Sequence, residues 1–171
     1  MRISLMLLAL FVAFANVPHA HAASVWTING ASCVPGDPAI QSNRYLITGG
    51  TVKHQPNATG LITLYCPITF PDLISSTCHE ELVVTYADSD GTGTVANVTA
   101  QLIKLDHGTG ALTNVGSPLN SNSFGPTTGT EMTTRIDACL SGFDQYYVRV
   151  DINRSKTSES ATLFGLRLMG V

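Results

Sequence analysis

Basic residues, charge and aromatic side chains are all scarce in this sequence. Lysine and arginine together supply only 9 of 171 residues, and the formal net charge is -3. A protein that holds nucleic acid through its phosphates needs a basic stripe, so the composition argues against that class of partner. Charged residues make up 12% and aromatic residues 7% of the chain. Low charge together with 44% hydrophobic residues also argues against intrinsic disorder.

No apolar run is long enough to cross a membrane, because a spanning helix needs about 20 apolar residues. An apolar stretch at residues 5–15 follows Arg2 and leads to the A-H-A ending at residues 20–22. A positive residue, a short apolar stretch and a small-residue ending are the three parts of a secretory signal peptide. We therefore expect residues 1–22 to be cleaved. Residues 23–171 would then form one exported domain, periplasmic or extracellular, with no transmembrane segment.

The cysteines are few, and all four fall in the part expected to be exported: Cys33, Cys66, Cys78 and Cys139. An even number of cysteines in an exported chain favours two disulfides. Their spacing lacks the paired C-x2-4-C knuckles of a four-thiolate zinc site. Sequence alone leaves three pairings open. Because Cys33 follows the first expected strand and Cys66 lies inside a later one, we expect Cys33–Cys66 and Cys78–Cys139.

Helical periodicity is missing, whereas two-residue alternation is strong. In residues 145–153 every second side chain is apolar, and Tyr147, Arg149 and Asp151 point the other way. Further strands are expected at residues 24–29, 44–48, 51–54, 61–68, 81–87, 94–105, 111–115, 131–137 and 161–169. Eight to ten short strands separated by turn residues predict an all-β antiparallel sandwich, Greek-key or jelly-roll, stabilised by disulfides. The polar residues 116–130 are expected to form a long solvated loop.

One turn carries a candidate metal site. Asp88 and Asp90, followed by Gly91, begin like the calcium loop of an EF-hand, but the twelfth position is Thr99 instead of glutamate. An EF-hand is therefore excluded. The turn is either a hairpin in which the aspartates bind their own backbone, or a looser calcium site with Asp88 and Asp90 as ligands. Calcium is the one cofactor that the sequence suggests.

Motifs of catalysis are missing as well. The chain has no G-x-S-x-G nucleophile turn, and the histidines form no H-x-H or HExxH pattern. We expect His54, His79 and His107 on surface turns, and we name no catalytic residue. The missing motifs favour a binding protein over an enzyme. An enzyme is not excluded, because motifs do not reveal a catalytic site that assembles from residues distant in the sequence.

Aromatic side chains on a sheet face can form a platform for sugar rings. The candidates are Trp26, Tyr45, Tyr65, Phe124 and Tyr147. Trp26 lies in the first expected strand and is expected in the core. Tyr147 is expected to face outward beside Arg149, by the alternation of its strand.

Three stretches of this chain resemble small secreted bacterial β-sandwich proteins to which no function is assigned. They are V-W-T-I-N-G at residues 25–30 with C-V-P at 33–35, G-L-I-T-L-Y-C-P-I at 60–68, and F-G-L-R-L at 164–168. The resemblance implies an exported bacterial sandwich and adds support to pairing Cys33 with Cys66. It supplies no catalytic residue.

Taken together, the sequence favours an exported, non-catalytic β-sandwich that acts as a binding or surface-structural module. Its partner would be a carbohydrate or a protein. Two alternatives stay open: a secreted hydrolase with a spatially assembled site, and a subunit of an extracellular assembly joined through an unpaired sheet edge.

Overall fold

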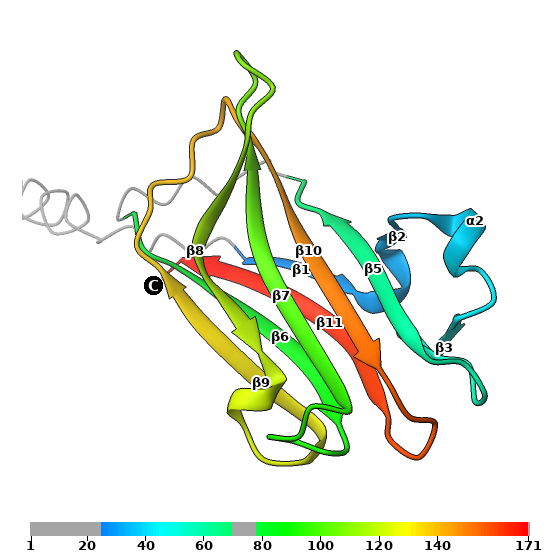
Figure 1. Cartoon of the computed structure of the whole chain (residues 1–171). Helices are drawn as coiled ribbons and strands as arrows, with labels where there is room; N and C mark the ends of the chain where they lie inside the picture. Colours follow the sequence, from blue (N-terminus) through cyan, green and yellow to red (C-terminus); the bar gives the residue numbers. More distant parts are fainter. Residues whose placement is uncertain (1–24, 70–77, 171) are drawn as a thin grey trace, which may run out of the picture.

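The computed structural model describes residues 25–69 and 78–170, and these fold into two stacked antiparallel β-sheets (Figure 1). The predicted all-β sandwich is confirmed, with eleven strands in the described ranges instead of eight to ten. The expected signal peptide, residues 1–22, lies outside the described residues. None of the helices in the described ranges has the length and apolar character that crossing a membrane requires.

The first sheet, which we call the β11 sheet, has six strands. Five follow the spatial order β3 (Tyr45–Thr48), β4 (Thr51–His54), β11 (Ala161–Gly170), β6 (Glu80–Asp88) and β9 (Thr127–Ile136). The sixth, β1 (Val25–Asn29), also pairs with β11. As a result, β11 has β4 as its neighbour over one part of its length and β1 over another.

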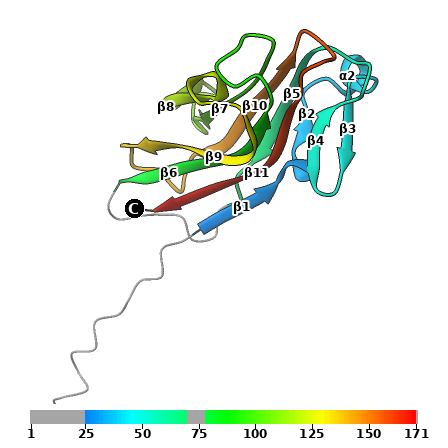
Figure 2. The same ribbon diagram turned by 90° about the horizontal axis from the view of Figure 1, so that it is seen from below.

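The second sheet, which we call the β10 sheet, has five strands. Their spatial order is β2 (Val34–Pro35), β5 (Gly60–Pro67), β10 (Gln145–Arg154), β7 (Ala96–Leu105) and β8 (Leu112–Asn120). Short helical turns join the strands: η1 (Gly30–Ser32), α2 (Pro38–Gln41) and η2 (Ser121–Ser123). Figure 2 shows the two sheets as separate layers, with α2, β3 and β4 together at one side.

Alternating side chains explain why these segments pair in two layers. In β10 every second residue is buried, including Val148, Val150 and Ile152, while Arg149 is exposed. Such a strand must cover its apolar face with a second sheet and can leave its other face to water. Trp26 lies in the core between the sheets with 7% of its surface exposed, as predicted.

One expectation about a loop was wrong. The sequence predicted a long loop over residues 116–130, but β8 runs on to Asn120 and β9 begins at Thr127. β8 is an edge strand, and the register of its pairing with β7 shifts between Ala100 and Leu102. An edge strand with a bulge is solvated and irregular, so it lacks the alternation by which strands are recognised.

Both disulfides form between the expected partners. Cys33 is joined to Cys66 in β5, and Cys78, just before β6, is joined to Cys139 in the connection from β9 to β10. The first bond ties the segment after β1 to the β10 sheet. The second bond ties the start of β6, in the β11 sheet, to the segment that leads into the β10 sheet. Disulfides of this kind are typical of proteins from oxidising compartments.

Candidate functional site

The outer face of the β10 sheet carries a cluster of aromatic and charged side chains, as the alternation of β10 predicted. Arg149 lies opposite Tyr65 of β5 on one side and Gln101 of β7 on the other. Tyr147 and Asp151 flank Arg149 along the same face of β10. We call the surface formed by Tyr65, Tyr147, Arg149 and Asp151 the tyrosine face.

Two tyrosines on this face touch each other. The ring centroids of Tyr65 and Tyr147 are 5.6 Å apart, and the ring planes meet at 84°, an edge-to-face contact. Diagonal neighbours on adjacent strands are close enough for aromatic rings to meet in this way. Gly36 leaves room for the Tyr65 ring, because a β-carbon at residue 36 would lie only 2.9 Å from Cε2 of that ring. The Tyr65 ring thus contacts Tyr147 and lies close to the backbone at Gly36.

The charged pair beside the tyrosines is also held in place. Nη2 of Arg149 lies 2.9 Å from Oδ2 of Asp151, and the Thr63 hydroxyl donates to Oδ1 of Asp151 at 2.7 Å. Thr63 in turn donates its backbone N–H to Gln41 of α2. The guanidinium group has more N–H donors than this ion pair uses. Arg149, about half exposed, therefore presents donors from a fixed position.

A hollow of about 370 Å³ continues the tyrosine face toward β8. Its polar lining comes from three strands: Thr99, Gln101, Asn114, Asn120, Arg149 and Asp151. Beside the hollow β8 bulges: Val115 lies opposite Leu102 and Leu119 opposite Ala100, so the β8 residues between them are extra to the ladder. The Gln101 amide donates to the carbonyls of Leu102 and Val115, both at 3.0 Å, and so ties β8 to β7 at the bulge. Aromatic rings and hydrogen-bonding groups thus lie side by side across four strands.

Burial tunes the chemistry of Tyr147. Its partly buried position raises the pKa of the Tyr147 hydroxyl, and the neighbouring Tyr65 raises it further. The hydroxyl therefore stays neutral at physiological pH and can both donate and accept a hydrogen bond.

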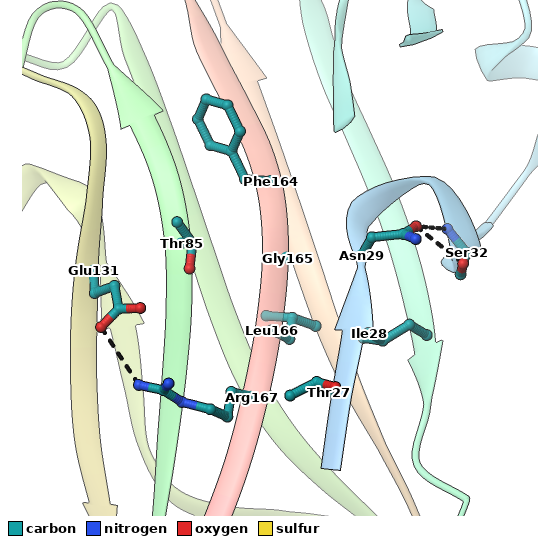
Figure 3. Close-up of a pocket in the computed structure, with 10 residues that line it drawn as sticks. All are labelled: Thr27, Ile28, Asn29, Ser32, Thr85, Glu131, Phe164, Gly165, Leu166 and Arg167. Carbon is teal, nitrogen blue, oxygen red and sulfur yellow. Dashed lines mark hydrogen bonds and ion pairs between the residues drawn. The ribbon is translucent and has the colours of Figure 1, made fainter. Parts of the chain in front are cut away.

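The opposite face of the molecule has a second hollow, of about 620 Å³, on the outside of the β11 sheet. It lies where β11 passes between β1 and β6, and Figure 3 shows its residues. Phe164 and Arg167 come from β11, Thr85 from β6 and Glu131 from β9. We call this hollow the β11 groove.

The predicted calcium ligands lie in a different place, at the turn after β6. The Asp88 side chain is buried and accepts a hydrogen bond from the Ser121 hydroxyl at 2.5 Å. Asp90 accepts from the backbone N–H of Val95 at 2.8 Å and of Ala96 at 3.3 Å. Burial raises the pKa of Asp88, and the hydrogen bond from Ser121 opposes that rise. Both carboxylates therefore bind groups of the chain itself.

Within the described residues, no cluster of three or more histidine, cysteine, aspartate or glutamate side chains is found that could hold a metal ion. The calcium site over Asp88 and Asp90 stays a prediction.

The expectation that all three histidines lie on the surface was wrong for His54. Only 4% of its surface is exposed, and its Nε2 donates to the carbonyl oxygen of Gly60 at 2.8 Å. Burial lowers the pKa of His54 in spite of this bond, and the charges of Arg154 and Arg44 lower it further. The short strand β4 gave too little alternation to show which way residue 54 points. His79 lies near the surface, with Nδ1 3.0 Å from Oδ1 of Asp137.

Sequence reasoning found part of the tyrosine face and missed the rest. It named Tyr65 and Tyr147 as aromatic candidates and placed Arg149 and Asp151 outward. It did not single out Thr63 or Gln101, although the alternation of their strands gives both an outward direction. The register that brings these positions together depends on three strands far apart in the sequence.

Comparison with known proteins gives structural matches alone. No protein-family model matches the chain, and no curated protein matches its sequence. The CBM36-1 domain of a multidomain xylanase from the hindgut metagenome of Trinervitermes trinervoides matches with a TM-score of 0.51 and 9% identity, over 86% of this chain and 98% of that one. A xylan-binding module, CBM15, matches with a TM-score of 0.51 and 15% identity, over 88% of this chain and 98% of that one.

A third match is the CBM22-1–GH10 part of a Clostridium thermocellum xylanase. Its TM-score is 0.50 at 11% identity, over 88% of this chain and 28% of that one. At these sequence identities the matches show the fold alone. The chain has the β-sandwich fold of these modules.

Proposed function

We propose that this protein is a non-catalytic carbohydrate-binding module that holds a neutral glycan strand against the tyrosine face. The observation that carries the proposal is the contact between Tyr65 and Tyr147 next to the Arg149–Asp151 ion pair. The proposal also takes in an exported location, periplasmic or extracellular, which the two disulfides support.

Sugar rings need two kinds of contact, and this face offers both. The C–H groups of a sugar ring form an apolar surface that packs on an aromatic ring, while its hydroxyls need donors and acceptors around the rim. Tyr65 supplies an aromatic surface with 39% of its area exposed. Arg149, Gln101 and the hollow toward β8 supply hydrogen-bonding groups. Because the site lies on paired strands, its geometry is set before the ligand arrives.

The charges of the face favour a neutral ligand. Arg149 is paired with Asp151 at 2.9 Å, so its positive charge is balanced where the ligand would lie. An acidic glycan would meet the carboxylate as well as the guanidinium group. A neutral glycan gains hydrogen bonds to both without breaking the ion pair.

Solved structures of the same fold support this reading. One is described as a xylan-binding module and another as a CBM36-1 domain of a xylanase. Neutral plant-wall polysaccharides are therefore the first ligands to test. The hydrolase and the assembly subunit stay alternatives from the sequence.

Affinity electrophoresis against soluble xylan, mixed-linkage glucan, galactan and glucomannan tests the proposal on the full chain with both disulfides formed. Retardation by one of them identifies the ligand, and titration calorimetry with its oligosaccharide gives the Kd. We expect Tyr65→Ala and Tyr147→Ala each to weaken binding about tenfold, a loss of about 1.4 kcal/mol.

Phe124→Ala is the matched control. Phe124 has the same exposed fraction as Tyr65, 39%, but follows η2 and belongs neither to the tyrosine face nor to the lining of its hollow. It should leave the Kd unchanged. Equal losses from Phe124→Ala and Tyr65→Ala, or binding untouched by both tyrosine variants, would show that the ligand lies elsewhere.

A further inference from the structure

The β11 groove exists because β11 changes its neighbour in the middle of the strand. Leu163 pairs with Val52 of β4, whereas Gly165 pairs with Asn29 of β1. Between them, the register against β6 shifts, so that Phe164 is an extra residue. A bulge of this kind turns a side chain out of the regular ladder and interrupts the sheet surface.

Gly165 forms the floor of the groove. It pairs with Thr85 on one side and with Asn29 on the other, and it has no side chain to fill the space between them. A β-carbon at residue 165 would lie 2.8 Å from the carbonyl oxygen of Ile28, so the close approach of β1 requires glycine here. The hollow is therefore built into the pairing of β1 with β11.

An aromatic ring and polar groups bound the groove. Figure 3 shows the Phe164 ring at one end, Thr85 in the middle, and Arg167 reaching across β6 toward Glu131 at the other end. Nη2 of Arg167 lies 3.5 Å from Oε2 of Glu131. This is longer than a charge-assisted hydrogen bond of about 2.7–2.9 Å, so the two groups keep hydrogen-bonding capacity for a hydroxyl that approaches both from the side.

The groove thus offers the same chemistry as the tyrosine face. Each has an aromatic ring, a guanidinium group and a carboxylate that balances its charge. The two lie on the outer faces of different sheets and so on opposite sides of the sandwich (Figure 2). A ligand on one does not block the other.

We propose that the β11 groove is a second glycan-binding site, which takes a neutral sugar chain and makes the module bivalent. This inference rests on the proposed function for the class of ligand. One molecule would then join two polysaccharide strands, and two weak sites on one rigid body would bind a polymer more tightly than either site alone.

Calorimetry with a short oligosaccharide, xylohexaose or the one selected by the screen above, measures the number of sites on the full chain. We expect two ligands per chain. Phe164→Ala combined with Arg167→Gln should leave one ligand per chain, with the Kd of the tyrosine face unchanged. Tyr65→Ala combined with Tyr147→Ala should leave one as well, bound at the groove. Wild-type protein should also make a solution of the polysaccharide turbid, and either double variant should abolish this cross-linking.

The outcomes separate the two proposals. One ligand per chain, lost with the tyrosine variants and untouched by Phe164→Ala/Arg167→Gln, overturns the second site and keeps the proposed function. One ligand lost only with Phe164→Ala/Arg167→Gln keeps the groove and overturns the tyrosine face. Binding to no glycan overturns both. Thr85→Trp, which places a large ring in the groove and keeps both charged residues in the chain, is a second variant for the same test. Unchanged melting curves verify that each variant is folded.

Discussion

Tyr147 and Arg149 point outward because a β-strand turns every second side chain to the same face. Their neighbours in β10 are apolar and drive the opposite face into the core, and this fixes the direction of the whole strand. Tyr65 owes its direction to the same rule in β5. At the scale of single residues, then, the outward set was readable from the sequence, including Thr63 and Gln101, which we did not single out.

Glu80 shows what residue patterns do not reveal. It begins β6 and is 1% exposed, and its Oε2 has no hydrogen-bond partner. Burial raises the pKa of Glu80 above its usual value of 4.5. The native state therefore favours the protonated form, so the protein is more stable below about pH 4.5 as far as this group is concerned. That contribution is lost as the pH rises through the native pKa.

Glu80→Gln should remove the cost of holding a buried charge, because the amide is neutral at every pH. We expect the variant to be more stable than wild type at pH 7 by about 1 kcal/mol, since burial disfavours the charged carboxylate and not the neutral amide. The difference should shrink toward zero at pH 4. Urea unfolding of both proteins from pH 4 to pH 8 measures it. A variant that is destabilised equally at both ends of this range would contradict the argument.

At the scale of elements, the long inner strands were predicted well, whereas the edge strand β8 was predicted poorly. Residues 145–153 and 161–169 carry strong alternation because they lie inside their sheets and have one apolar face. β8 lies at an edge, is exposed over most of its length and contains a bulge. Pairing with β7, and no local alternation, makes this segment a strand. Because its sequence is rich in glycine, proline and polar residues, it resembles a loop.

The acidic turn after β6 is the element with an open prediction. If Asp88 and Asp90 bind calcium, excess calcium after EDTA treatment raises the melting midpoint by mass action. Asp90→Asn keeps an acceptor for the N–H of Val95 but removes a charge, so it should abolish the shift while leaving the turn folded. Melting curves of wild type and variant, with and without calcium, measure this. An unchanged wild-type midpoint would make the turn a plain connection, which here joins β6 of one sheet to β7 of the other instead of closing a hairpin.

At the scale of the whole molecule, the disulfides link segments that the strand order separates. Cys33 and Cys66 are 33 residues apart, and Cys78 and Cys139 are 61 residues apart. Cross-links of this span restrict the unfolded chain. By the chain-entropy argument, each contributes about 3–4 kcal/mol.

Cys33→Ala/Cys66→Ala should therefore lower the free energy of unfolding by about 3–4 kcal/mol, and Cys78→Ala/Cys139→Ala by a similar amount, because loop entropy grows only with the logarithm of length. Urea unfolding of the two double variants against wild type measures both. Near-zero loss for either pair would mean that the bond raises the free energy of the folded state by about as much as it raises that of the unfolded state.

By itself, the sequence determined the fold class, the inward and outward faces of the long strands, and the set of aromatic candidates. These follow from local alternation and composition, which act over a few residues. The tertiary structure alone decided that Tyr65 meets Tyr147, that Arg149 lies between β5 and β7, that His54 is buried, and that β11 changes neighbours at Phe164. Each of these depends on the register between strands that are distant in the chain, and register is set by the packing of the whole core.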